Sequence, residues 1–281
     1  MCAFKGWNDA GESATAALSF LGTALDATRF ATIDPEDFVD FQSTRPTVRL
    51  RGGLTRHIDW PEFEIYEARI PRAPRDLILL SGPEPAIRWR TFCEQVIDLS
   101  EALGVQMVTS LGALLADVPH SRPVSVTGIA SDESLVDRLG LNASQYEGPT
   151  GIVGVLQAAA TDAGIPAASL WAAVPHYVAV VPNPKGALAL LRKLETLVGV
   201  TVDASDLETA AGDYDRQVTR AVELDPEVQA FVERLERAAD EEEAGESEDL
   251  PSGDVLAREF QRFLRQRGSG GPGGQPPHAS S

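Results

Sequence analysis

RDLILLSGPEPAIRWRTFCEQVIDLSEALG, residues Arg75–Gly104, is the stretch that decides the fold class. Asp76–Leu80 predicts a strand, and the Gly-Pro pair after it predicts a turn. The helix expected next carries one apolar stripe at i, i+4, i+7 and i+11, formed by Phe92, Val96, Leu99 and Leu103. Gly104 is expected to end this helix, because glycine readily adopts the left-handed conformation found just after helices.

The same alternation of short strand and helix continues on both sides, from Trp7 to about Val200. It predicts a three-layer α/β domain, with helices on both faces of the sheet. Residues 34–72 read differently, with strand-like pieces around Gly-Gly and Asp-Trp-Pro turns. We interpret them as antiparallel strands or a hairpin excursion, which makes the sheet mixed.

The C-terminal part of the chain is helical and charged. Asp225 and Pro226 are the expected N-cap and first residue of its second helix. We divide the chain into five parts: a core domain at 1–204, a helical pair packed on it at 205–240, an acidic linker at 241–252, a short amphipathic helix at 253–267 and a disordered tail at 268–281.

The composition excludes several classes of protein. The 281 residues carry a net charge of -18, which disfavours nucleic acid and anionic membranes as partners. No apolar run approaches the ~20 residues of a membrane-spanning helix, and no secretory signal is readable. The two cysteines, Cys2 and Cys93, suit a reduced protein. We therefore expect a cytoplasmic protein with no nucleic-acid or membrane partner.

The segment FKGWNDAGESATAALSFL, Phe4–Leu21, places a turn before a helix. Asn8 and Asp9 are good N-cap residues there. The turn is either a ligand or anion site at a helix N-terminus or simply a capped strand-to-helix connection, since neither a P-loop nor a dinucleotide motif is present. Trp7 in this loop indicates packing against a neighbouring loop or a second subunit.

Glu84 and Arg88 lie between a predicted strand and the first turn of the next helix. The helix dipole favours the glutamate but not the arginine, so we expect Arg88 to pair with a carboxylate elsewhere. A weak surface ion pair is the alternative to a functional site.

His120 and His176 each follow an apolar run and a proline, in DVPHSRP and AVPHY. We expect them near each other, with Arg122, at the carboxyl edge of the sheet, where α/β proteins bind ligands. Two interpretations are open. The histidines act as an acid, a base or a ligand, or they are structural side chains that bond to backbone groups at the strand ends. Their spacing makes no metal motif, and no Gly-x-Ser-x-Gly elbow occurs, so we expect no metal and no cofactor.

Glu147 and Thr150 precede a helix rich in glycine and alanine, in YEGPTGIVGV. Thr150 is expected to cap this helix. The segment is weak as a phosphate loop, because no lysine or arginine follows it.

Taken together, these motifs resemble one family. GWNDAG, SLGALLADVPHSRPVSVTG, YEGPTGIVGVL and SLWAAVPHYVAVVPNPKGALALL are similar to the proteasome assembly chaperone family, second-chaperone type, in its high-GC Gram-positive bacterial branch, over about Phe4–Asp240. The resemblance implies a three-layer fold similar to phosphorylase/hydrolase-like proteins, oligomerisation, and binding of proteasome α-subunits.

The chain departs from the family pattern at both ends. Some members dock through a C-terminal hydrophobic-Tyr-any tripeptide, whereas this chain ends HASS. Members usually have a longer strand before the first turn, where this chain has MCAFK, so we expect the natural product to be longer.

The sequence thus predicts a non-enzymatic interaction protein that binds partner subunits, with proteasome α-subunits as candidates, as a homo-oligomer for which a trimer is one candidate. No catalytic residue is assigned. The candidate binding or interface residues are Trp7, Asn8, Asp9, Glu84, Arg88, His120, Arg122, Glu147, Thr150 and His176. The alternative is a small-molecule-binding protein, or a hydrolase- or ligase-like enzyme, with a pocket at the same edge where the carboxylates and histidines converge.

Overall fold

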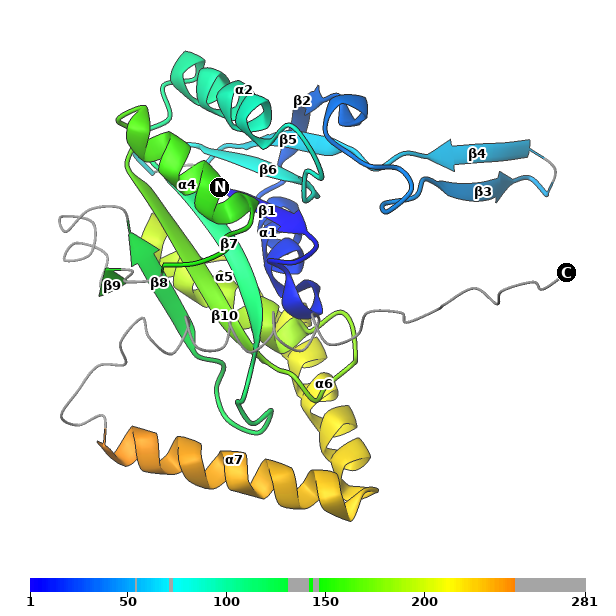
Figure 1. The fold of residues 1–281 in the computed structure, drawn as a ribbon, viewed down its shortest axis with the longest axis vertical. Coiled ribbons are helices and arrows are strands. Elements are labelled where there is room, and N and C mark those ends of the chain that lie inside the picture. The colour runs from blue at the N-terminus through cyan, green and yellow to red at the C-terminus, as the bar shows by residue number, and fades with distance from the viewer. Residues whose placement is uncertain (54, 71–72, 131–141, 144–146, 246–281) are drawn as a thin grey trace, which may run out of the picture.

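A computed structural model describes residues 1–53, 55–70, 73–130, 142–143 and 147–245. Its centre is an eight-stranded mixed sheet in the order β2-β5-β6-β1-β7-β10-β8-β9 (Figure 1). The strands are β1 Cys2–Lys5, β2 Thr28–Ile33, β5 Phe63–Ala68, β6 Leu77–Pro83, β7 Val108–Ala116, β8 Val126–Ala130, β9 Asn142–Ala143 and β10 Ala167–Pro175.

The inner strands β6, β1, β7 and β10 run parallel, whereas β2, β5 and β8 join antiparallel neighbours. β10 pairs with β7 along its whole length, from Ala167 opposite Val108 to Pro175 opposite Ala116. The two strands therefore end together, and the loops that follow them leave from the same edge of the sheet.

Helices cover both faces of the sheet, as the sequence predicts (Figure 1). α1 Ser13–Ala24 and α5 Pro184–Val198 pack on one face, around a core that includes Leu18, Leu111 and Leu190. α2 Trp89–Ala102 and α4 Ile152–Asp162 pack on the other, around Phe92 and Leu156. The architecture is a three-layer α/β sandwich.

The expected apolar stripe of α2 is correct at three positions and wrong at the fourth. Phe92 and Val96 are buried, and Leu99 packs against the same core. Leu103 is 45% exposed, because the helix ends at Ala102 and Leu103 is its C-cap. Gly104 follows with φ +65°, so it ends the helix as predicted.

The hairpin excursion predicted within residues 34–72 is present. After the short helix η2 Pro35–Asp37, strands β3 Thr47–Arg51 and β4 Thr55–Asp59 form a separate antiparallel sheet that projects from the body (Figure 1). Gly52 and Gly53 turn the chain at φ +62° and +82°, values that suit glycine.

Two C-terminal helices follow, α6 Ser205–Glu223, which packs on α5, and α7 Pro226–Gly245. Asp225 Oδ1 accepts hydrogen bonds from the amides of Glu227 and Val228, at 2.9 and 3.3 Å, so the predicted cap is confirmed. α7 continues five residues into the segment expected to be the acidic linker.

The rest of that linker, the expected helix at 253–267 and the tail at 268–281 lie outside the described residues, and the division into domains stays a prediction. Among the helices described, none has both the length and the apolar character needed to cross a membrane.

Candidate functional site

Asp9 caps α1. Its Oδ1 accepts hydrogen bonds from the backbone amides of Ala14 at 2.7 Å and Thr15 at 3.3 Å, and its Oδ2 accepts one from the Thr15 hydroxyl. Burial raises the pKa of the Asp9 carboxyl above its usual range, against the opposing effect of these bonds. The capped-turn interpretation of this segment holds at Asp9, which satisfies amides that the first helical turn leaves free.

Asn8 does not cap α1, contrary to expectation. It is buried, and its Nδ2 instead donates to Glu84 Oε1 at 2.8 Å, while its Oδ1 has no hydrogen-bond partner. The Trp7 backbone amide donates to Glu84 Oε2 at 3.4 Å. The two polar side chains of the turn therefore bond to different elements. Asp9 bonds to α1, which follows the turn, and Asn8 bonds to Glu84 at the end of β6.

Glu84 also caps α4, the role expected of Thr150. Its Oε1 accepts a 3.0 Å hydrogen bond from the Ile152 amide, which places a carboxylate at the positive end of that helix. Thr150 is exposed, and the N-cap residue is Gly151, which makes no side-chain cap. A Cβ on Gly151 would lie 2.3 Å from Asn8 Nδ2, so this close approach requires glycine.

Arg88 precedes α2 and reaches a carboxylate elsewhere, as predicted. It makes an ion pair with Asp37 and lies over the ring of Phe38, 5.7 Å from its centroid. The ion pair is half-exposed, so its contribution to stability is small. Glu147, in the loop before α4, is exposed.

The two histidines meet at Tyr177, at the edge where β7 and β10 end. Their rings lie edge-on to the tyrosine ring, with centroids 6.0 Å away for His120 and 5.9 Å for His176. The expectation that they lie close together is therefore correct. Tyr177 was not singled out from the sequence, although it directly follows His176.

His120 is a buried structural histidine. Its Nδ1 lies 2.8 Å from the Tyr177 hydroxyl and its Nε2 3.1 Å from the Thr219 hydroxyl of α6. Burial lowers the pKa of His120, and burial raises the pKa of Tyr177 to about 12, so both are neutral near pH 7. His176 is more exposed, and its Nδ1 lies 3.0 Å from Asp117 Oδ1.

Arg122 ties the loop after β7 to α7. Its Nε and Nη2 donate to the two Asp240 oxygens at 2.8 and 2.9 Å, and its Nη1 lies 3.8 Å from Glu236. Phe231 of α7 packs edge-on against His176 and Tyr177, at 5.5 and 5.9 Å. The C-terminal helices therefore pack against the histidines, with His120 buried and His176 left exposed.

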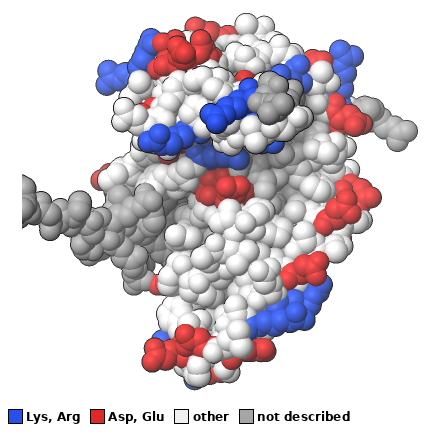
Figure 2. Space-filling model, turned by 90° about the vertical axis from the view of Figure 1, so that its right-hand side faces the viewer, with Lys and Arg blue, Asp and Glu red and all other residues white. Residues whose placement is uncertain are grey.

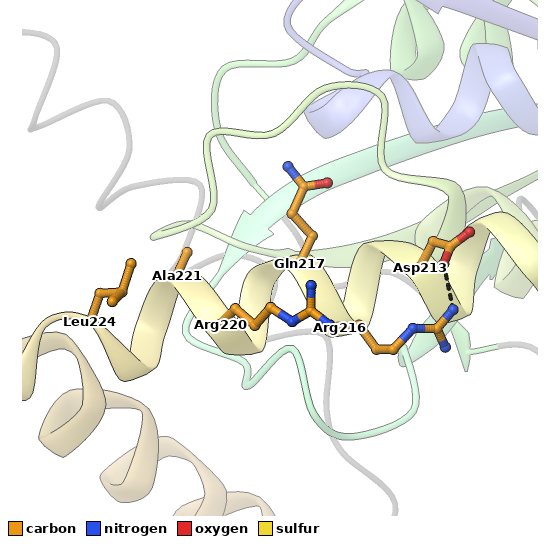
Figure 3. A pocket seen from close by; sticks show the side chains of 6 residues that line it. All are labelled: Asp213, Arg216, Gln217, Arg220, Ala221 and Leu224. Atoms are coloured by element: carbon orange, nitrogen blue, oxygen red, sulfur yellow. Dashed lines mark hydrogen bonds and ion pairs between the residues drawn. The ribbon is translucent and has the colours of Figure 1, made fainter.

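In the described part of the chain, the hydrogen bonds of the candidate side chains go to different helices. Asp9 holds α1, Glu84 holds α4, and His120 bonds to α6. A surface hollow on α6 contains none of the candidates (Figure 3). It is lined by Asp213, Arg216, Gln217, Arg220, Ala221 and Leu224. Within the described parts of the chain, no three histidine, cysteine, aspartate or glutamate side chains are grouped so that they could hold a metal ion.

The chain is similar to known proteins in both sequence and structure. The model of the PAC2 family matches residues 3–222. A PAC2 family protein from Streptomyces avermitilis is 47% identical, with 82% of this chain and 97% of that chain covered and a TM-score of 0.76. A proteasome-assembly chaperone homologue from Mycobacterium tuberculosis is 44% identical, with 82% and 98% covered and a TM-score of 0.75.

A more distant match shares the fold alone. It is a proteasome activator from Pyrococcus furiosus, 17% identical, with 79% of this chain and 92% of that chain covered and a TM-score of 0.60. The comparison with curated proteins gave no match.

Proposed function

The chain belongs to the PAC2 family, and on that premise we propose that it is a non-enzymatic, cytoplasmic interaction protein that binds proteasome α-subunits during assembly, as a homo-oligomer. The Mycobacterium relative, 44% identical, is described as a proteasome-assembly chaperone homologue, which supports the connection with the proteasome. Likeness of fold alone would be weak support for a function, so the proposal also has to agree with the site.

The observation that carries the proposal is that buried and half-buried polar side chains serve as anchors for the helices. Asp9 forms hydrogen bonds with α1, Glu84 with α4, and His120 with α6. An active site needs several such groups within hydrogen-bond reach of one substrate atom. Here they hold different helices, so their effect is to fix the loops of the edge rather than to act on a substrate.

Fixed loops present a defined surface to a partner. Around the anchors, four candidate side chains are exposed, namely Arg88, Glu147, Thr150 and His176, and Trp7 is partly exposed. Tryptophan and arginine are over-represented among residues that dominate binding energy at protein interfaces. We therefore assign the partner-binding surface to this edge.

The test is co-purification of the tagged full-length protein with the proteasome α-subunits of its native host. Glu147→Lys changes the charge of the edge, and Glu223→Lys makes the same change at an exposed position on α6. We expect the wild type and Glu223→Lys to retain α-subunits and Glu147→Lys to lose them. Failure of the wild type to retain α-subunits would reject the proposal, and a thermal shift on adding a small molecule would favour the ligand-binding alternative.

A further inference from the structure

The β3–β4 hairpin has an uncovered apolar face. We call residues 45–60 the arm. Val48, Leu50 and Ile58 are 53%, 64% and 46% exposed. Val48 pairs with Ile58 across the two strands, and Leu50 pairs with Arg56, so all four side chains share one face. Three large apolar side chains and one arginine are therefore presented together.

The main sheet does not support this face. β3 and β4 pair only with each other, and an isolated two-stranded hairpin is marginally stable in water. The arm is fixed at its base, where the Trp60 ring lies 5.0 Å from that of Phe41, and five-residue strands extend about 14 Å beyond it. A projecting apolar face of this kind favours a protein partner that covers it.

The charge of the arm narrows the choice of partner. Residues 45–60 contain four arginines and one acidic residue, Asp59, in a chain whose net charge is -18. Figure 2 looks along the arm from its tip, and it shows basic residues in that upper part of the surface, with acidic residues above and below them. Pairing of two arms would bring like charges together, which is unfavourable. The arm therefore fits an acidic surface.

The exposed face of α2 is complementary to the arm. Glu94, Asp98 and Glu101 lie on it at i, i+4 and i+7, and no basic residue follows Arg90 in this helix. Exposed Ile87 and Leu103 flank the helix at its two ends. By contrast, α6 and α7 mix arginines with their carboxylates along the exposed surface, which weakens their attraction for a basic arm.

We propose that the arm of one copy docks against α2 of a second copy, with Val48, Leu50 and Ile58 in contact and Arg56 facing the α2 carboxylates. This inference rests on the homo-oligomer in the proposed function and names its contact surface. Because the arm and α2 are different surfaces, the contact is head-to-tail. Such contacts form a closed ring when the rotation between copies closes.

The test is the mass of the full-length protein in solution, by light scattering and sedimentation over a range of concentrations. Leu50→Ser with Ile58→Ser removes the apolar contact. Leu224→Ser, at a position 86% exposed beside the end of α6, is the matched control. We expect the wild type and the control to be oligomers. The arm variant should already dissociate at protein concentrations roughly tenfold or more above those at which the wild type dissociates.

A charge exchange tests the choice of α2. Arg56→Glu should dissociate the oligomer, Arg220→Glu should not, and Arg56→Glu combined with Asp98→Arg in the same chain should restore it. A thermal melt would show whether the serine variant folds poorly. In that case the charge variants test the arm contact in its place.

Each unfavourable outcome has a distinct meaning. An oligomer that survives both arm variants overturns the arm contact and leaves the homo-oligomer standing. Dissociation that the charge exchange does not reverse overturns α2 as the acceptor. A monomeric wild type overturns the arm contact and the proposed homo-oligomer together, whereas capture of α-subunits is measured separately.

Discussion

The side-chain amide of Asn8 donates a 2.8 Å hydrogen bond to Glu84, 76 residues away along the chain. The same carboxylate oxygen accepts a 3.0 Å bond from the Ile152 amide at the start of α4. One carboxylate thus joins the turn after β1, the end of β6 and the start of α4. Glu84 therefore holds these three elements together at the edge of the sheet.

Replacing Glu84 with alanine should lower the free energy of unfolding by about 1–3 kcal/mol, because the Asn8 and Ile152 donors would lose a shared acceptor. Glu84→Gln keeps one acceptor oxygen and should cost less. Chemical denaturation measures both, with Glu223→Ala, at an exposed position on α6, as the control. Equal stability of Glu84→Ala and the control would contradict the bridging role.

Asp9→Ala should destabilise the protein by about 0.5–2 kcal/mol, the usual cost of losing a helix cap, because the amides of Ala14 and Thr15 lose their acceptor. Asp9→Asn retains an acceptor oxygen and should be closer to the wild type. Thermal melts monitored by circular dichroism give the comparison. If both substitutions cost the same, the carboxylate charge rather than the cap would matter most.

Local signals in the sequence were enough to predict much of the fold. The alternation of strands and helices gave the three layers, Asp225-Pro226 gave the start of α7, and paired glycines gave the hairpin turn. Each of these signals lies within a few neighbouring residues. Local pattern is therefore a reliable guide to elements whose geometry is set by their own residues.

The site was harder to predict because its bonds join distant parts of the chain. Thr150 has the right residue type and position for a cap, but the Ile152 amide instead donates to Glu84, which lies 68 residues before Ile152 in the chain. Arg88 could be expected to find a carboxylate, but the sequence could not identify Asp37. The histidines were recognised, whereas the tyrosine that joins them and the α6 hydroxyl beneath them depend on how the C-terminal helices pack.

His120 should make stability fall with acidification. Burial, the largest effect, lowers its folded-state pKa below the ordinary 6.5; the Asp215 and Glu236 charges oppose this, and Lys185 adds to it. Below pH 6.5 the unfolded chain therefore binds more protons than the folded chain, and stability falls as pH decreases toward the folded-state pKa.

His120→Gln cannot gain this charge. It should be less stable than the wild type at about pH 7.5, with a gap that narrows toward about pH 5.5. Melting temperatures across this range test the prediction, and His176→Gln, which alters the more exposed ring, is the control. A gap that stays constant or widens on acidification would be inconsistent with a neutral, buried His120.

The attachment of α7 should depend more on Phe231 than on Arg122. The arginine pair with Asp240 is partly exposed, and such pairs typically contribute ~0.2–1 kcal/mol. Phe231 packs against His176 and Tyr177, and loss of such a ring removes both apolar burial and the edge-on ring contacts. Amide hydrogen exchange in α7 should therefore accelerate strongly in Phe231→Ala and only slightly in Arg122→Ala at physiological salt. The reverse order would mean that the ion pairs, not the rings, hold this helix over the edge of the sheet.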